Sequence, residues 1–168
     1  MVTAGVLAAN VPSVGYKTYY LVEAMETPTW PPTCQLKDLG PREPLVLETD
    51  QFTLELQRPS GKVSLYDKVL RKWVLKSAVV VGEETDMARR FDAFDHYATG
   101  REFTFNLLQA QLAENGPVYA RLVVRGFVEQ VNVEQEWTLY KDLRRVDLTV
   151  TTIGPAPIAA ALQQTLPT

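Results

Sequence analysis

One short stretch of the chain gathers residue types that could do chemistry. Asp92, Asp95 and His96 fall within five residues of one another, beside the aromatic residues Phe94 and Tyr97. Carboxylate oxygens and a neutral imidazole are ligands for divalent metals, and the same groups could serve as an acid and a base. Aromatic rings next to carboxylates also match the apolar and hydroxyl faces of a pyranose sugar.

A metal site is one interpretation of this stretch, and three others remain open. Three metal ligands from so short a span rarely converge, so we assign no metal ligand here. The stretch is then an irregular loop with solvated charges, an acid–base site that uses His96 with Asp92 or Asp95, or a loop that lines a sugar cleft. For the last interpretation we nominate five carbohydrate contacts and no catalytic residue: Asp92, Phe94, Asp95, His96 and Tyr97.

The rest of the chain lacks the motifs of several large enzyme classes. His96 is the sole histidine and Cys34 the sole cysteine, which excludes internal disulfides and cysteine-rich zinc modules. No G-x-S-x-G elbow, P-loop or G-x-G-x-x-G occurs, so no motif in the sequence supports serine hydrolase or nucleotide-binding chemistry. Glycosidases use two carboxylates, but with 20 acidic residues the sequence does not single out a pair.

Composition predicts one ordinary globular domain over residues 1–168. The chain is 46% hydrophobic and has a formal charge of −3, so we expect no nucleic acid partner. Four arginines, at 121, 125, 144 and 145, have acidic neighbours at 129, 134, 136 and 142, which predicts a solvated face and not a basic patch. No basic leader or long apolar run occurs, so we expect no membrane segment and a cytoplasmic location.

The elements that must position the candidate loop are predicted to be β-strands. Apolar and polar residues alternate with period two, as in Phe52, Leu54 and Leu56, which is typical of strands with one buried face. The expected strands lie at 16–23, 45–57, 63–65, 73–75, 103–112, 118–125, 131–140 and 146–150. On the last of these we expect Val146, Leu148 and Val150 to face inward.

The connections between these strands complete the prediction. Five of the eleven prolines lie in the segment 27–44, which is therefore expected to be a connection or an edge. Residues 83–100 show neither the period-two repeat of a strand nor the 3.6-residue repeat of a helix. Residues 154–168 predict a weakly ordered tail with one or two helical turns at 158–164. Antiparallel strands joined by short turns indicate an all-β antiparallel β-sandwich with little helix.

Six segments of the chain resemble, in order and near spacing, parts of glycoside hydrolase family 38 α-mannosidases. The segments are VPSVGYKTY at 11–19, LETDQF at 47–52, PSGKVSLYDK at 59–68, FDAFD at 91–95, GPVYARL at 116–122, and LYKDLRRVD at 139–147. Together they span about residues 8–150. Phe94 and Leu148 depart from the family pattern, which often has tryptophan at these two positions, and the chain after Thr152 matches poorly.

The resemblance implies a β-supersandwich of the galactose-mutarotase type, the domain that follows the helical bundle in such enzymes. In that family the zinc ion, its ligands and the nucleophile belong to an N-terminal α/β barrel, and no position here matches those motifs. The resemblance therefore implies a chain that is inactive alone, with no cofactor of its own. It also implies that the zinc belongs to the parent enzyme, and that the partners are the N-terminal catalytic domain and a mannoside substrate.

A second hypothesis is a free-standing carbohydrate-binding or scaffold module with no catalytic partner. The two hypotheses differ in the surface that they predict. Part of a larger enzyme should expose an apolar patch where its neighbour docks, and could form a homo-oligomer through it, whereas an autonomous module should bury its apolar side chains.

Overall fold

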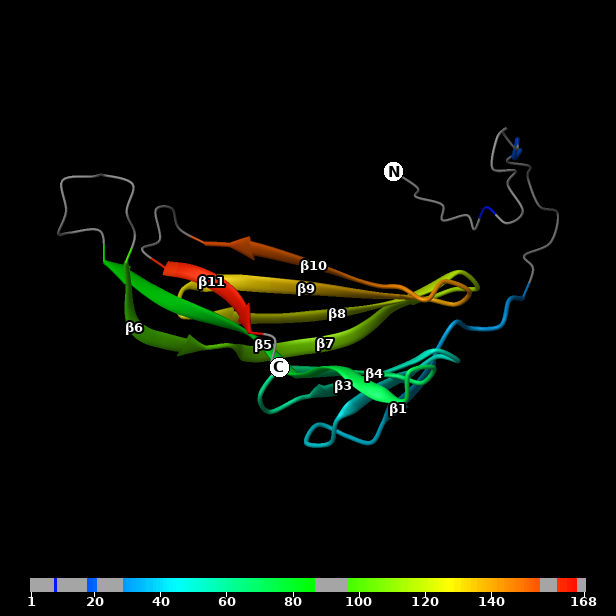
Figure 1. Cartoon of the computed structure of the whole chain (residues 1–168), viewed down its shortest axis with the longest axis horizontal. Helices are drawn as coiled ribbons and strands as arrows, with labels where there is room; N and C mark the ends of the chain where they lie inside the picture. Colours follow the sequence, from blue (N-terminus) through cyan, green and yellow to red (C-terminus); the bar gives the residue numbers. More distant parts are fainter. Residues whose placement is uncertain (1–7, 9–17, 21–28, 87–96, 155–159, 166–168) are drawn as a thin grey trace.

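The computed structural model describes residues 8, 18–20, 29–86, 97–154 and 160–165 of the chain (Figure 1). Within these ranges the protein consists of strands, turns and connections without a helix, and its two antiparallel sheets confirm the all-β sandwich. The first strands are β1 (Gln35–Asp38), β2 (Leu45–Glu48), β3 (Phe52–Gln57), β4 (Lys62–Asp67), β5 (Lys72–Asp86) and β6 (Tyr97–Thr104). The later strands are β7 (Asn106–Asn115), β8 (Tyr119–Val128), β9 (Val131–Tyr140), β10 (Val146–Ile153) and β11 (Ala160–Thr165).

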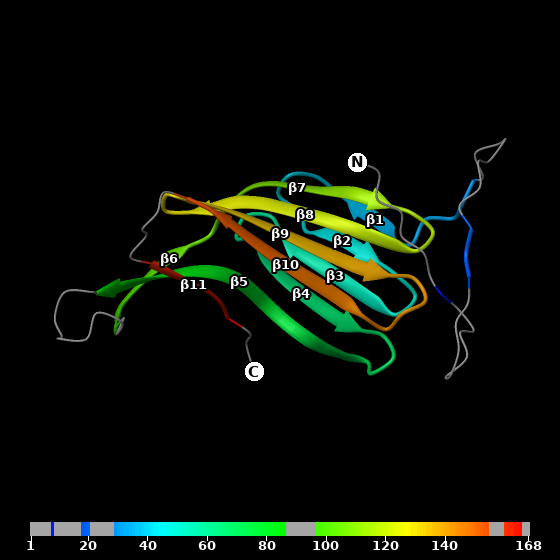
Figure 2. The same cartoon turned by 90° about the horizontal axis from the view of Figure 1, so that it is seen from above.

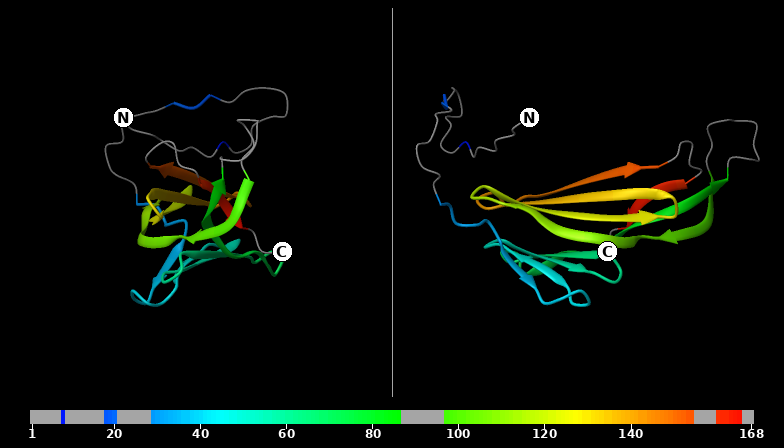
Figure 3. Two further views of the ribbon diagram at one scale, coloured as in Figure 1. Left: turned by 90° about the vertical axis from the view of Figure 1, so that its left-hand side faces the viewer. Right: turned by 180° about the vertical axis from the view of Figure 1, so that it is seen from behind.

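The two sheets form two layers. The larger, seven-stranded sheet has the order β1-β2-β3-β4-β5-β11, and β6 also pairs with β5. The second sheet has four strands in the order β10-β9-β8-β7. Seen from above, strands β7 to β10 lie over strands β1 to β4 (Figure 2), and the side views show the separation of the layers (Figure 3).

The core lies between the inner faces of the two layers, where the predicted alternation is confirmed. Phe52, Leu54 and Leu56 of β3 are buried, while the residues between them are only partly covered. Strand β9 repeats this pattern, because side chains at every second position of a strand share one face. Leu122, Val124, Val133 and Leu139 of the four-stranded sheet complete the cluster with Leu47 and Val63 of the larger one.

Strand β5 corrects the prediction of short strands around Trp73. It runs for 15 residues and continues through Glu83 and Glu84. Its register against β4 gains one residue between Leu75 and Ala78, and Ser77 there has a φ of 49°, which is typical of a bulge. From residue 79 on, β5 pairs with β11 and β6 in place of β4, so the charged stretch at 83–86 belongs to a strand.

One further expectation is confirmed and two change in the structure. Strand β1 lies in the proline-rich segment and pairs only with β2, so this segment supplies an edge strand as expected. Helical turns were expected at 158–164, but residues 160–165 form β11 and pair with residues 79–84 of β5. Of the strand expected at 16–23, the structure describes 18–20, and these three residues are not in a strand.

The strand expected at 103–112 is divided at Phe105, which is 2% exposed. Two glycines make room for this ring. A Cβ at Gly126 would lie 2.2 Å from the carbonyl oxygen of Asn106 and 2.4 Å from the Phe105 ring, and one at Gly61 would lie 2.5 Å from the same ring. The division therefore lets one aromatic side chain fill the space between the layers where β6 passes into β7.

Candidate functional site

The loop nominated from the sequence lies almost wholly outside the described residues. Asp92, Phe94, Asp95 and His96 are not described, and Tyr97 is described only as the first residue of β6, opposite Asp86. The sugar-contact and acid–base hypotheses for this loop therefore stay predictions.

The described residues bring together a different set of polar groups, at the end of the sandwich that we call the turn end. It contains four turns: the β2–β3 turn (49–51), the β4–β5 turn (68–71), the β7–β8 turn (116–118) and the β9–β10 turn (141–145). The last two lie on the right-hand side of Figure 1. Because consecutive antiparallel strands reverse at alternate ends of a sheet, these turns meet at one end.

Hydrogen bonds tie the four turns together in pairs. The Lys68 amide donates to the Gln51 carbonyl at 2.8 Å, and the Lys141 amide donates to the Val118 carbonyl at 3.0 Å. Across the two layers, Arg144 Nη2 lies 2.6 Å from Asp67 Oδ2, whose side chain is 5% exposed. The turn end is thus held by contacts within each sheet and by one ion pair between the sheets.

The segment before β1 is fixed to the β7–β8 turn. Thr33 Oγ1 donates to the Gly116 carbonyl at 2.6 Å. The Cys34 amide donates to Asn115 Oδ1, and Asn115 Nδ2 donates back to the Cys34 carbonyl, both at 3.0 Å. Burial raises the pKa of the Cys34 thiol to about 11, so this group stays protonated near neutral pH and is a poor nucleophile.

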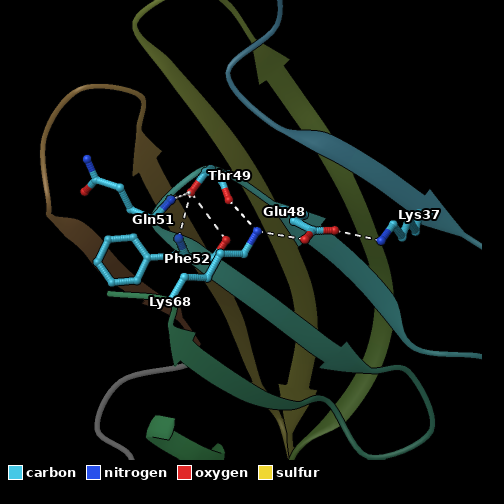
Figure 4. A network of polar contacts seen from close by, with 6 residues as sticks. All are labelled: Lys37, Glu48, Thr49, Gln51, Phe52 and Lys68. Atoms are coloured by element: carbon cyan, nitrogen blue, oxygen red, sulfur yellow. Dashed lines mark hydrogen bonds and ion pairs between the residues drawn. The ribbon is translucent and has the colours of Figure 1, made fainter. Parts of the chain in front are cut away.

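Two lysines hold the carboxylate of Glu48 (Figure 4). Lys37 Nζ donates to Glu48 Oε2 and Lys68 Nζ to Glu48 Oε1, each at 2.7 Å. These contacts, the Lys37 bond first and the Lys68 bond second, lower the pKa of Glu48 from 4.5 to about 2. Glu48 is therefore ionised at neutral pH and cannot act as a general acid there.

Thr49 fixes the β2–β3 turn next to this carboxylate. Its buried hydroxyl accepts from the Gln51 amide at 3.3 Å and the Phe52 amide at 3.0 Å, and donates to the Phe52 carbonyl (Figure 4). Lys68 Nζ donates to the Thr49 carbonyl at 2.7 Å as well as to Glu48. The turn and the lysine that spans it are thereby fixed relative to each other.

These groups surround a cavity of about 490 Å³, which we call the turn-end pocket. It is lined by residues 31–35, residues 48–50, Lys68 and Lys141. Unlike Glu48 and Lys68, the side chains of Asp50 and Lys141 make no hydrogen bond or ion pair with the described part of the chain. The pocket therefore offers one carboxylate and one ammonium group that are not engaged by the described residues.

Two titratable groups that line the pocket are held in one protonation state near neutral pH. Glu48 is held ionised, and the Cys34 thiol is held protonated. Over the described ranges, no group of three or more His, Cys, Asp or Glu residues is placed to hold a metal ion. The lining of the pocket presents hydrogen-bond donors and acceptors on a fixed frame.

The arginines considered in the sequence analysis do form part of a paired, solvated face. On neighbouring strands, Arg121 pairs with Glu136 and Arg125 with Glu134, as expected from the sequence. Arg121 also contacts Glu114 at 2.7 Å. The β9–β10 turn differs from the expectation, because Arg144 pairs with Asp67 and Arg145 with Asp147, neither of them an acid that we had proposed.

Comparison with known proteins adds no relative: no protein-family model matches the chain, and no curated protein matches it. Helices long and apolar enough to cross a membrane do not occur among the described residues.

Proposed function

We propose that the chain is the β-sandwich portion of an α-mannosidase-like glycoside hydrolase, with the galactose-mutarotase type of fold. In this proposal the chain supplies structure and contacts to carbohydrate. The zinc ion and the catalytic carboxylates are supplied by an N-terminal barrel, which is the chain's partner domain. The chain by itself then binds mannosides and does not hydrolyse them.

The observation that carries the proposal is that segments quoted for the family resemblance meet at the turn end. Glu48 from segment 47–52 contacts Lys68 from segment 59–68. Asp67 of that second segment contacts Arg144 of segment 139–147. Side chains from segments far apart in sequence thus depend on one another, which supports reading the segments as parts of one structural unit.

A second observation favours the hypothesis that the chain is part of a larger enzyme over the hypothesis of a free-standing module. Five large apolar side chains are exposed in the β4–β5 turn, the start of β5 and the β9–β10 turn, which the Arg144–Asp67 ion pair holds together. They are Val69 (61% exposed), Leu70 (49%), Trp73 (37%), Val74 (45%) and Leu143 (42%). Exposed apolar side chains gathered in one region are typical of an interface with another domain.

Two experiments test the proposal. The DNA upstream of the chain is read for an open frame that encodes a family 38 barrel, which we expect to find. An independent promoter and start at this chain would contradict the proposal and favour the free-standing module. The purified chain is also assayed with 4-nitrophenyl α-D-mannopyranoside and added zinc, where we expect no turnover. A rate comparable to that of a complete mannosidase would contradict the division of labour.

A further inference from the structure

We propose that the turn-end pocket is a binding subsite for one pyranose ring, with Asp50 and Lys141 as its two principal polar contacts. This site is separate in sequence from the loop at 91–97. The choice of a sugar as ligand rests on the proposed function, while the position of the site rests on the pocket itself.

The pocket has the size and the rigidity that a subsite needs. Its volume of about 490 Å³ lies within the range of small-molecule sites. Its walls are held before any ligand arrives, because Cys34 is bonded to Asn115 and Lys68 is bonded to Glu48 and Thr49. A preformed site loses little free energy to ordering when it binds.

The balance of charge in the pocket favours a neutral ligand. Glu48 and Lys68 lie 2.7 Å apart and offset each other, and Asp50 and Lys141 carry opposite charges. An inorganic anion would gain from Lys141 but would meet the carboxylate of Asp50, which offsets that gain. A neutral ligand meets no such repulsion.

Hydroxyl groups match the two side chains that the described residues leave unengaged. A carboxylate only accepts hydrogen bonds and an ammonium group only donates them, whereas each sugar hydroxyl does both. Asp50 can therefore accept from hydroxyls on one side of a ring while Lys141 donates to an oxygen on the other. Pro31 and Pro32 add an apolar wall, which suits the C–H face of a pyranose.

The test is an NMR titration of the ¹⁵N-labelled full chain with methyl α-D-mannopyranoside, in parallel with glycine and with inorganic phosphate. We expect saturable shifts from the sugar at residues 33–35, 49–50 and 141, with a dissociation constant on the order of 1 mM. Asp50→Asn and Lys141→Met should each weaken binding about tenfold or more, because each removes a charge-assisted hydrogen bond. Glu43→Gln and Lys62→Met change exposed charges outside the pocket and should bind like the unaltered chain.

Several outcomes would overturn the subsite. They are an absence of shifts from the sugar in a folded chain, shifts confined to other residues, equal binding by Asp50→Asn and Lys141→Met, or tighter binding of glycine or phosphate. Each variant's spectrum outside the pocket reports whether it is folded, so lost binding is distinguished from lost structure. The upstream reading frame tests the proposed function independently of these titrations. The subsite can therefore fail while the proposed function stands, and the proposed function can fail while the subsite stands.

Discussion

Strands β9 and β10 lie side by side in the four-stranded sheet, and both alternate apolar and polar residues, yet their apolar side chains end in different environments. On β9, Val133 is 2% and Leu139 0% exposed. On β10, Val150 is 40% exposed, and Val146 and Leu148 are only partly buried. The difference follows from position, because β9 has a neighbour on each side and packs on the opposite layer, whereas β10 is an edge strand. Alternation thus determines which side chains share a face, and the opposing layer determines whether that face is buried.

The largest expected effect contrasts the two strands directly. Leu139→Ala should destabilise the fold by about 2–5 kcal/mol, because it leaves a cavity in a close-packed core. Val150→Ala should cost less than about 1 kcal/mol, because its side chain already contacts solvent. Urea denaturation of both variants measures the two losses. Equal losses would show that β10 is covered as well as β9.

A second contrast uses two glycines in and next to β8. Gly126→Ala should cost about 1–3 kcal/mol or more, because its Cβ would collide with the Asn106 carbonyl and the Phe105 ring. Gly116→Ala is the control, since its Cβ would meet only the Tyr119 carbonyl oxygen at 3.8 Å. Thermal denaturation compares the two, and a stable Gly126→Ala variant would contradict the tight passage around Phe105.

Comparison of the two strands also shows how far the sequence could predict the fold. The buried faces of β3 and β9 follow from alternation, because both strands are covered by the other layer. The same rule placed Val150 inward but could not show that its side chain stays 40% exposed on an edge strand. Strand β11 was missed because its structure comes from pairing with β5, about 80 residues away in the chain, and not from its own pattern.

The candidate site was even less accessible from the sequence. Glu48 and Lys68 lie in segments quoted for the family resemblance, but no spacing rule joins them. Cys34 and Asn115, which fix one wall of the turn-end pocket, are 81 residues apart. A site built from turns at one end of a sandwich becomes visible only when the strand order is known.

A third, smaller effect is expected at the ion pair between the layers. The pKa of Asp67 is lowered, chiefly by the Leu70 amide and further by Arg144. The ionised Asp67 therefore contributes to stability at pH values above the ordinary carboxyl pKa. This contribution is lost as the pH falls through the lowered pKa of Asp67 in the folded chain. Arg144→Gln should lower the urea midpoint at neutral pH, and the difference should shrink in acid.

The control for this prediction is Arg42→Gln, an exposed arginine for which the described residues show no ion pair. Its urea midpoint should match that of the unaltered chain at both pH values. A difference between Arg144→Gln and the unaltered chain that did not depend on pH would contradict the assigned role of Asp67.

The smallest expected effect concerns Glu48. Lys37→Met and Lys68→Met should each raise the pKa of Glu48 from about 2 toward its ordinary 4.5, because each removes one of the two ammonium groups that hold the carboxylate. Carbon-detected NMR titration of the Glu48 carboxyl measures this. Lys62→Met should leave the value unchanged, and an unchanged value in both test variants would contradict the network in Figure 4.

The most direct test of the account follows one NMR sample over time. The labelled chain, zinc and 4-nitrophenyl α-D-mannopyranoside are mixed, and signals of protein and sugar are recorded together. The account predicts shifts of residues around the turn-end pocket while the mannoside remains intact. Release of free mannose at the rate of a glycosidase, or an intact mannoside that leaves every signal of the turn end unmoved, would contradict it.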